Sequence, residues 1–128
     1  MSGPAAAHLK KIRMNLARSP EHPNGSTQHG YEFTAPLDSE GHIDPVAWKR
    51  ERQHCRVRRF WGLEADDVGH LVHRPGGSWA FVYDIAGDED DEAGYRFGRH
   101  AFNIGEYVSV KDEDGEMHTF QVVTVENV

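Results

Sequence analysis

The chain has 128 residues, a formal net charge of −7, a hydrophobic content of 38% and a single cysteine, Cys55. This length fits one domain over residues 1–128, preceded by a flexible leader at residues 1–8. A lone cysteine excludes a disulfide within the chain, and no apolar run approaches the roughly 18 residues that a membrane span needs. We therefore expect a cytoplasmic protein that does not enter a membrane.

Most of the chain has the two-residue period of β-strands. Apolar and polar side chains alternate over residues 12–16 and again over residues 31–35, and residues 55–61 form a third strand of mixed pattern. Further strands are predicted at residues 68–73, at 79–83, from residue 95, at 107–110 and at 117–125. Tight turns at Arg74–Gly77 and Asp112–Gly115 predict hairpins, because Pro and Gly, or Asp and Gly, supply the required backbone angles.

One helix interrupts the strands. Asp44 is a suitable N-cap, and Pro45 is preorganised for the first helical position. Ile43 and Trp48 stand at the positions that form a hydrophobic staple across the cap. We predict a short helix from Pro45 to about His54.

These elements predict a mostly β fold of the α+β class. About eight strands with local connections and one helix favour a single-domain antiparallel small barrel or a strongly curved sheet. Trp79, Phe81 and Tyr83 share one face of their strand, and we expect such aromatic side chains to fill the interior.

Charge is divided unevenly along the chain. Residues 1–63 hold ten Lys and Arg against six Asp and Glu, whereas residues 64–128 hold four against fifteen. Folding brings the halves together, and any charge that stays uncompensated leaves one basic and one acidic face. We place the acidic run at residues 88–92 away from the basic face.

This charge division indicates a binding module rather than an enzyme, since no nucleophile, phosphate-binding or dinucleotide-binding motif is present. The predicted target is an acidic protein surface or a small anionic ligand, with no cofactor. The candidate residues for this face are Arg56, Arg58, His70, His73 and Arg74.

The nine histidines give a second hypothesis, a metal-binding protein or a metal-dependent hydrolase. His70 and His73 are three residues apart on a predicted strand, so they point to opposite faces and only one can join a given site. The candidate ligands are therefore His70 or His73 together with His100, His118 and a carboxylate such as Glu106.

Basic and aromatic residues alternate near residues 56–61, a mixture that also occurs on sheets that bind single-stranded nucleic acid. Strand parity separates Arg58 and Phe60 on one face from Arg59 and Trp61 on the other. The arginines can instead pair with acidic residues on neighbouring strands. The net negative charge also disfavours phosphate binding, so nucleic acid is the third hypothesis.

Four stretches of the chain, at residues 29–33, 57–61, 70–77 and 112–118, resemble those of a family of small uncharacterised bacterial proteins of unknown function. The resemblance would extend over nearly the whole chain. It implies no activity, cofactor or partner.

Overall fold

The computed structural model describes residues 7–83, 95–97, 100–112 and 115–128. Seven strands of at least five residues and the three-residue β6 lie within this part of the chain. The strands are β1 (His8–Leu16), β2 (Ser26–Leu37), β3 (Arg56–Trp61), β4 (Asp67–His73), β5 (Trp79–Tyr83), β6 (Tyr95–Phe97), β7 (Tyr107–Lys111) and β8 (Met117–Asn127).

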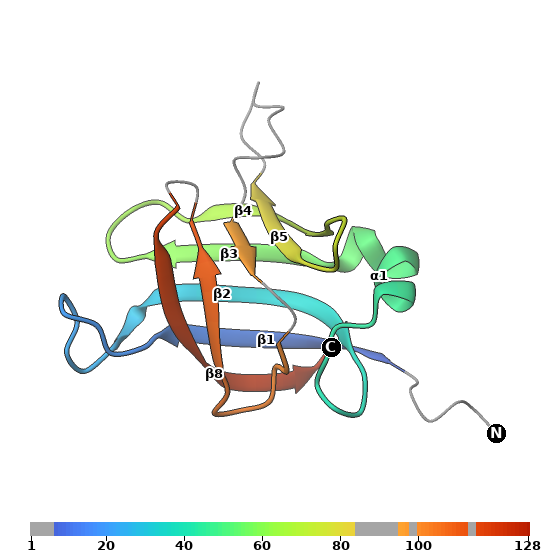
Figure 1. The fold of residues 1–128 in the computed structure, drawn as a ribbon, viewed down its shortest axis with the longest axis horizontal. Coiled ribbons are helices and arrows are strands. Elements are labelled where there is room, and N and C mark those ends of the chain that lie inside the picture. Colours follow the sequence, from blue (N-terminus) through green and yellow to red (C-terminus); the bar gives the residue numbers. More distant parts are fainter. Residues whose placement is uncertain (1–6, 84–94, 98–99, 113–114) are drawn as a thin grey trace.

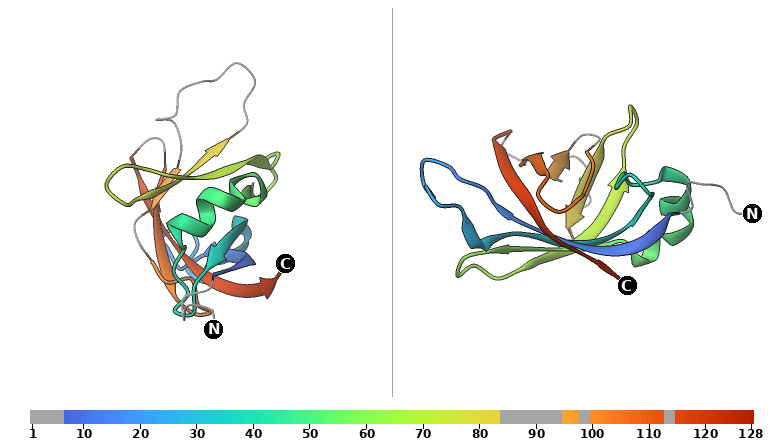
Figure 2. Two further views of the ribbon diagram at one scale, coloured as in Figure 1. Left: turned by 90° about the vertical axis from the view of Figure 1, so that its right-hand side faces the viewer. Right: turned by 90° about the horizontal axis from the view of Figure 1, so that it is seen from below.

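The strands form one strongly curled antiparallel sheet in chain order (Figures 1 and 2). Each strand pairs with the next, and β1 also pairs with β8, so the sheet closes into a barrel. Closure satisfies the hydrogen-bonding groups that an open edge would expose. The predicted mostly β fold, an antiparallel small barrel or strongly curved sheet with one short helix, is confirmed.

The helix α1 (Pro45–Glu51) continues into a 3-10 turn, η1 (Arg52–His54). It begins as predicted, because Asp44 Oδ1 accepts hydrogen bonds from the backbone N–H groups of Val46 at 2.8 Å and Ala47 at 3.2 Å. In Figure 1, α1 lies at one end of the barrel, whereas the β1–β2 and β3–β4 loops lie at the other end. The two ends therefore present different side chains.

Some predicted boundaries change. β1 begins at His8, inside the predicted leader, and residues 1–6 of that leader lie outside the described residues. β2 begins at Ser26, five residues before the alternation that predicted it. The acidic run at residues 88–92 also lies outside the described residues.

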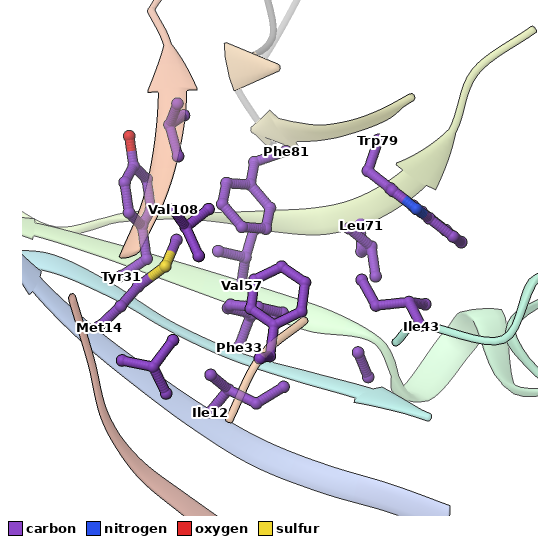
Figure 3. Close-up of a cluster of buried hydrophobic side chains, with 14 of the residues drawn as sticks. Ile12, Met14, Tyr31, Phe33, Ile43, Val57, Leu71, Trp79, Phe81 and Val108 are labelled. Atoms are coloured by element: carbon purple, nitrogen blue, oxygen red, sulfur yellow. The ribbon is translucent and has the colours of Figure 1, made fainter. Parts of the chain in front are cut away.

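The barrel interior is packed with apolar side chains from at least six strands (Figure 3). Phe33 and Phe81 meet at its centre, with ring centroids 5.1 Å apart. Trp79 and Phe81 are buried, as predicted, whereas Tyr83 is only partly buried against the core. A barrel filled in this way leaves functional groups at its ends and on its outer face.

The sole cysteine, Cys55, links η1 to β3 and belongs to this core. Its thiol donates to the Glu51 carbonyl oxygen at 3.3 Å. Burial, together with the nearby Glu51 carboxylate, raises the pKa of the Cys55 thiol to about 11. The sulfur therefore stays protonated at neutral pH and acts as a small apolar group.

Gly30 allows a close approach of β1, β2 and β3. It pairs with Asn15 on β1 and with Phe60 on β3. A Cβ atom at this position would lie 2.1 Å from the Met14 carbonyl oxygen and 3.0 Å from the Phe60 ring. The ring of Phe60 thus occupies space that only glycine leaves open.

We predict that Gly30→Ala lowers the free energy of unfolding by about 1–3 kcal/mol, because the new methyl group overlaps main-chain atoms. Urea unfolding followed by circular dichroism measures the change. The control is Thr124→Ala on the exposed side of β8, which should stay within about 0.5 kcal/mol of wild type. Equal stability of the two variants would contradict the proposed packing.

Candidate functional site

Arg56, Arg58 and His70 gather on the outer face of the barrel. Val57, between the two arginines, is buried, so Arg56 and Arg58 point outward. Arg56 pairs in register with His70 on β4, and its Nη1 lies 2.9 Å from His70 Nδ1. Three of the five predicted partner-binding residues are therefore neighbours.

β1 adds two cations to this surface. Arg13, Glu32 and Arg58 form one cross-strand row over β1, β2 and β3. Lys11 lies diagonally from that row, with its Nζ 3.8 Å from Glu32 Oε1. We call the surface formed by Lys11, Arg13, Arg56, Arg58 and His70 the basic face.

Two carboxylates lie within the basic face and fix its central arginine. Arg58 contacts Asp66 Oδ2 at 2.8 Å and Glu32 Oε1 at 3.3 Å. The hydrogen bond to Asp66, with a further contribution from Glu32, raises the pKa of Arg58. The pairing predicted for Arg58 with acidic residues of neighbouring segments is thus present, yet the four Lys and Arg side chains still outnumber these two carboxylates.

A shallow depression of about 320 Å³ opens in the basic face. Its lining includes the cations Lys11, Arg56 and Arg58, the carboxylate Glu32, and Thr34 and Val68. Val68 in this lining is 47% exposed. The depression thus combines an exposed apolar side chain with three cations and one carboxylate, and the excess of cations suits a carboxylate-bearing side chain.

Phe60 is on the same outer face but is covered. The guanidinium carbons of Arg13 and Arg58 lie 4.4 and 5.1 Å from its ring centroid, and the residue is only 8% exposed. A nucleic-acid base would have to displace an arginine to stack on this ring.

His73 and Arg74 lie apart from the basic face. His73 lies three residues after His70 and two after buried Leu71, so it shares the inward face of β4 with Leu71. Its ring centroid lies 4.3 Å from that of Trp79. Arg74 starts the β4–β5 turn, where its backbone N–H donates to the Ser78 carbonyl at 2.8 Å. The opposite orientation of His70 and His73 follows the alternation that the sequence predicts.

The predicted histidine ligands do not converge with one another. Within the described residues, the structure contains one group of three side chains with ligand atoms mutually close, and His118 is its only predicted member. His70 contacts Arg56 and His73 contacts Trp79. The other two predicted ligands are separate as well: His100 is half-buried, and Glu106 is exposed on the turn before β7.

Asp112, Glu116 and His118 form that group on the β7–β8 hairpin, with ligand atoms within 4.8 Å of one another. His118 Nε2 lies 3.1 Å from Asp112 Oδ2 and 3.9 Å from Glu116 Oε1. Asp112 Oδ1 also accepts the Glu116 backbone N–H at 2.8 Å, so the turn itself orients this carboxylate. One imidazole and two carboxylates are suitable ligands for a divalent metal.

A further cluster of histidine and aromatic rings lies beside this hairpin. His29 contacts His22 with ring centroids 4.8 Å apart, and it meets Trp61 edge-on at 4.7 Å. Trp61 in turn lies 5.9 Å from His118 and is covered by the Arg59 guanidinium at 4.2 Å. The sequence predicted that Arg59 and Trp61 share one face of β3. It did not predict that they lie near His29 and His118, because that depends on which strands are neighbours.

The pKa of His29 is lowered below its ordinary value of 6.5. Burial is the main cause, and the nearby His22 and Arg59 add to it, whereas Glu64 acts in the opposite direction. Burial likewise lowers the pKa of His100. Both side chains are therefore held in the neutral form at pH values where an exposed histidine begins to take up a proton.

Searches of protein families, of curated proteins and of solved structures find no match for this chain. The resemblance to small bacterial proteins therefore stays a prediction. No helix in the described part of the chain is long and apolar enough to cross a membrane. The basic face and the hairpin group are the two sites whose chemistry bears on function.

We predict that the free energy of unfolding falls as the pH drops below 6.5. The unfolded chain then binds protons at His29 and His100 that the folded chain excludes, so protonation favours unfolding. Urea unfolding at a series of pH values measures the slope. His29→Asn should give a shallower slope than the control His8→Asn at the exposed start of β1, and equal slopes would contradict the assignment to His29.

Proposed function

We propose that the protein is a non-enzymatic binding module that recognises an acidic protein surface through the basic face. The observation that supports this most is the convergence of Lys11, Arg13, Arg56 and Arg58 from two strands onto one outer sheet surface. Such a concentration of positive charge steers acidic partners and disfavours basic ones. The cytoplasmic location predicted from the sequence is part of this proposal.

The extent of the basic face favours a protein over a small ligand. Its cations are distributed from β1 to β3, and neighbouring strands lie about 4.8 Å apart, so the charged row spans roughly 10 Å. A single phosphate or carboxylate reaches only part of that span. A small anion in the depression between Lys11, Arg56 and Arg58 is the narrower form of the same proposal.

The internal carboxylates support recognition rather than oppose it. Glu32 and Asp66 hold the Arg58 guanidinium in one orientation, so less side-chain freedom is lost when a partner binds. Arg56 contacts His70 and is exposed on the same face.

We predict that Arg56→Glu removes the bound partners, because it reverses an exposed charge on the basic face. The assay is affinity capture from an extract of the source cells, followed by quantitative mass spectrometry. Partner recovery should fall about tenfold or more and should also fall with salt, since exposed charges are screened.

Arg18→Glu is the matched control, because Arg18 is exposed in the β1–β2 loop outside the basic face. Partner recovery with this variant should equal that of wild type. Equal recovery with Arg56→Glu and with wild type would exclude the basic face. Partners that are nucleic acids rather than proteins would instead favour the third hypothesis from the sequence.

A second candidate function is divalent-metal binding on the β7–β8 hairpin. It is favoured by the convergence of Asp112, Glu116 and His118, of which His118 was predicted as a ligand. The hypothesis in its original form, with His70 or His73, has no support from the geometry. Three protein ligands would leave further coordination positions for water or substrate.

We predict that Zn²⁺ binds this hairpin in isothermal titration calorimetry, at one ion per chain. His118→Ala should weaken binding by at least about tenfold, because it removes the imidazole ligand. His70→Ala is the control and should bind as wild type does, since His70 contacts Arg56 instead. Absence of heat in the wild type, or equal affinity in both variants, would exclude the site.

A further inference from the structure

An apolar groove lies between α1 and the end of β4, separate from the basic face. Its volume is about 530 Å³, and it is lined by Pro45, Val46, Trp48, Lys49, Arg50 and His73. Val46 is 68% exposed on its wall, although most apolar side chains of this barrel are buried. A concave apolar surface next to cations is typical of a site for another molecule.

The floor of the groove is held in place by contacts inside the barrel. Trp48 Nε1 donates to the Leu71 carbonyl oxygen at 3.0 Å, which fixes the indole. The ring of Trp48 also meets those of His73 at 5.9 Å and Trp79 at 5.6 Å. Trp48 is itself only 8% exposed, so it supports the groove from below, and the apolar surface open to a partner is that of Pro45 and Val46. This support is in place before any partner arrives, which reduces the entropy lost on binding.

A second depression, of about 410 Å³, shares Pro45 and His73 with the groove and continues along the β4–β5 turn. Its lining adds Ile43, Trp79 and the turn residues 76–78. Together the two hollows extend on both sides of His73. They offer length for a peptide segment rather than only a pocket for a compact ligand.

The rim of the groove is positively charged. Lys49 and Arg50 stand in the last turn of α1, and the Arg52 guanidinium carbon lies 5.2 Å from the centre of the Trp48 ring. The described residues that line the groove include no carboxylate. Charge complementarity therefore selects an acidic occupant.

We propose that this groove docks a short acidic segment of the partner protein, with one large apolar side chain packed against Pro45 and Val46 beside His73. The inference rests on the proposed function, because the segment that the groove docks belongs to the same acidic partner that the basic face recognises. Lys49, Arg50 and Arg52 precede Arg56 in the chain, and η1 leads directly into β3. The rim and the two β3 arginines of the basic face therefore belong to one continuous stretch of the chain.

The division of labour between the two surfaces follows from their chemistry. Aromatic and arginine side chains in a concave setting supply most of the binding energy at protein interfaces. Exposed cations add on-rate and specificity. A segment with both an apolar anchor and flanking carboxylates uses both kinds of contact.

The test is fluorescence anisotropy with a fluorescein-labelled peptide in which Asp and Glu residues flank a Leu-Phe pair. Val46→Asp should weaken binding about tenfold or more, because it places a carboxylate on the groove wall. The variant should fold normally, since an acidic residue in the first turn of a helix is favourable and α1 has none there. Circular dichroism melting checks this.

Leu63→Asp is the matched control. Leu63 is fully exposed in the β3–β4 loop, at the barrel end opposite α1 (Figure 1), and its substitution should leave peptide affinity unchanged. A second control peptide carries Ser-Ser in place of Leu-Phe and should bind at least about tenfold more weakly.

Three results would overturn the groove as the docking site. They are no binding of the acidic peptide, equal binding of the Ser-Ser peptide, and equal affinity of Val46→Asp and wild type. If Val46→Asp binds the peptide as wild type does but Arg56→Glu loses the captured partners, the basic face is supported and the groove is excluded. If Val46→Asp loses peptide affinity while Arg56→Glu retains every captured partner, the groove stands and the basic face fails.

Discussion

The pairing of β1 with β8 is the constraint on which the rest of the structure depends. Because β1 is held on both edges, the side chains of its two faces have fixed neighbours. Ile12 and Met14 fill the interior, while Lys11 and Arg13 lie beside the charges of β2 and β3. An open sheet with β1 at its edge would leave those two cations on a fraying strand. Closure thus creates both the core and the basic face.

Features encoded by neighbouring residues could be predicted from the sequence. The cap at Asp44 and the opposite orientations of His70 and His73 depend on local geometry, and both are present. Features that depend on register between distant strands could not. The row of Arg13, Glu32 and Arg58 and the meeting of Trp61 with His118 join segments that only the closed sheet makes neighbours.

The histidines show the same difference between local features, which the sequence predicts, and contacts between distant strands, which it does not. The high number of histidines in the sequence predicted metal ligands. A metal site, however, needs ligand atoms that lie close together in space. The carboxylates close to His118, those of Asp112 and Glu116, lie in the same hairpin, because the turn between β7 and β8 brings the three residues together. The four other predicted residues stand on segments with different neighbours. A search for residues that flank one turn would have identified this group from the sequence.

The environment of Cys55 has a consequence for the covalent chemistry of the chain. The thiol is enclosed by the core, and its pKa of about 11 leaves almost no thiolate at neutral pH. Thiolate is the species that attacks disulfides and peroxides, so the folded protein resists both mixed-disulfide formation and oxidation to sulfenic acid. The fold therefore keeps Cys55 in the thiol form in reducing and in oxidising surroundings alike.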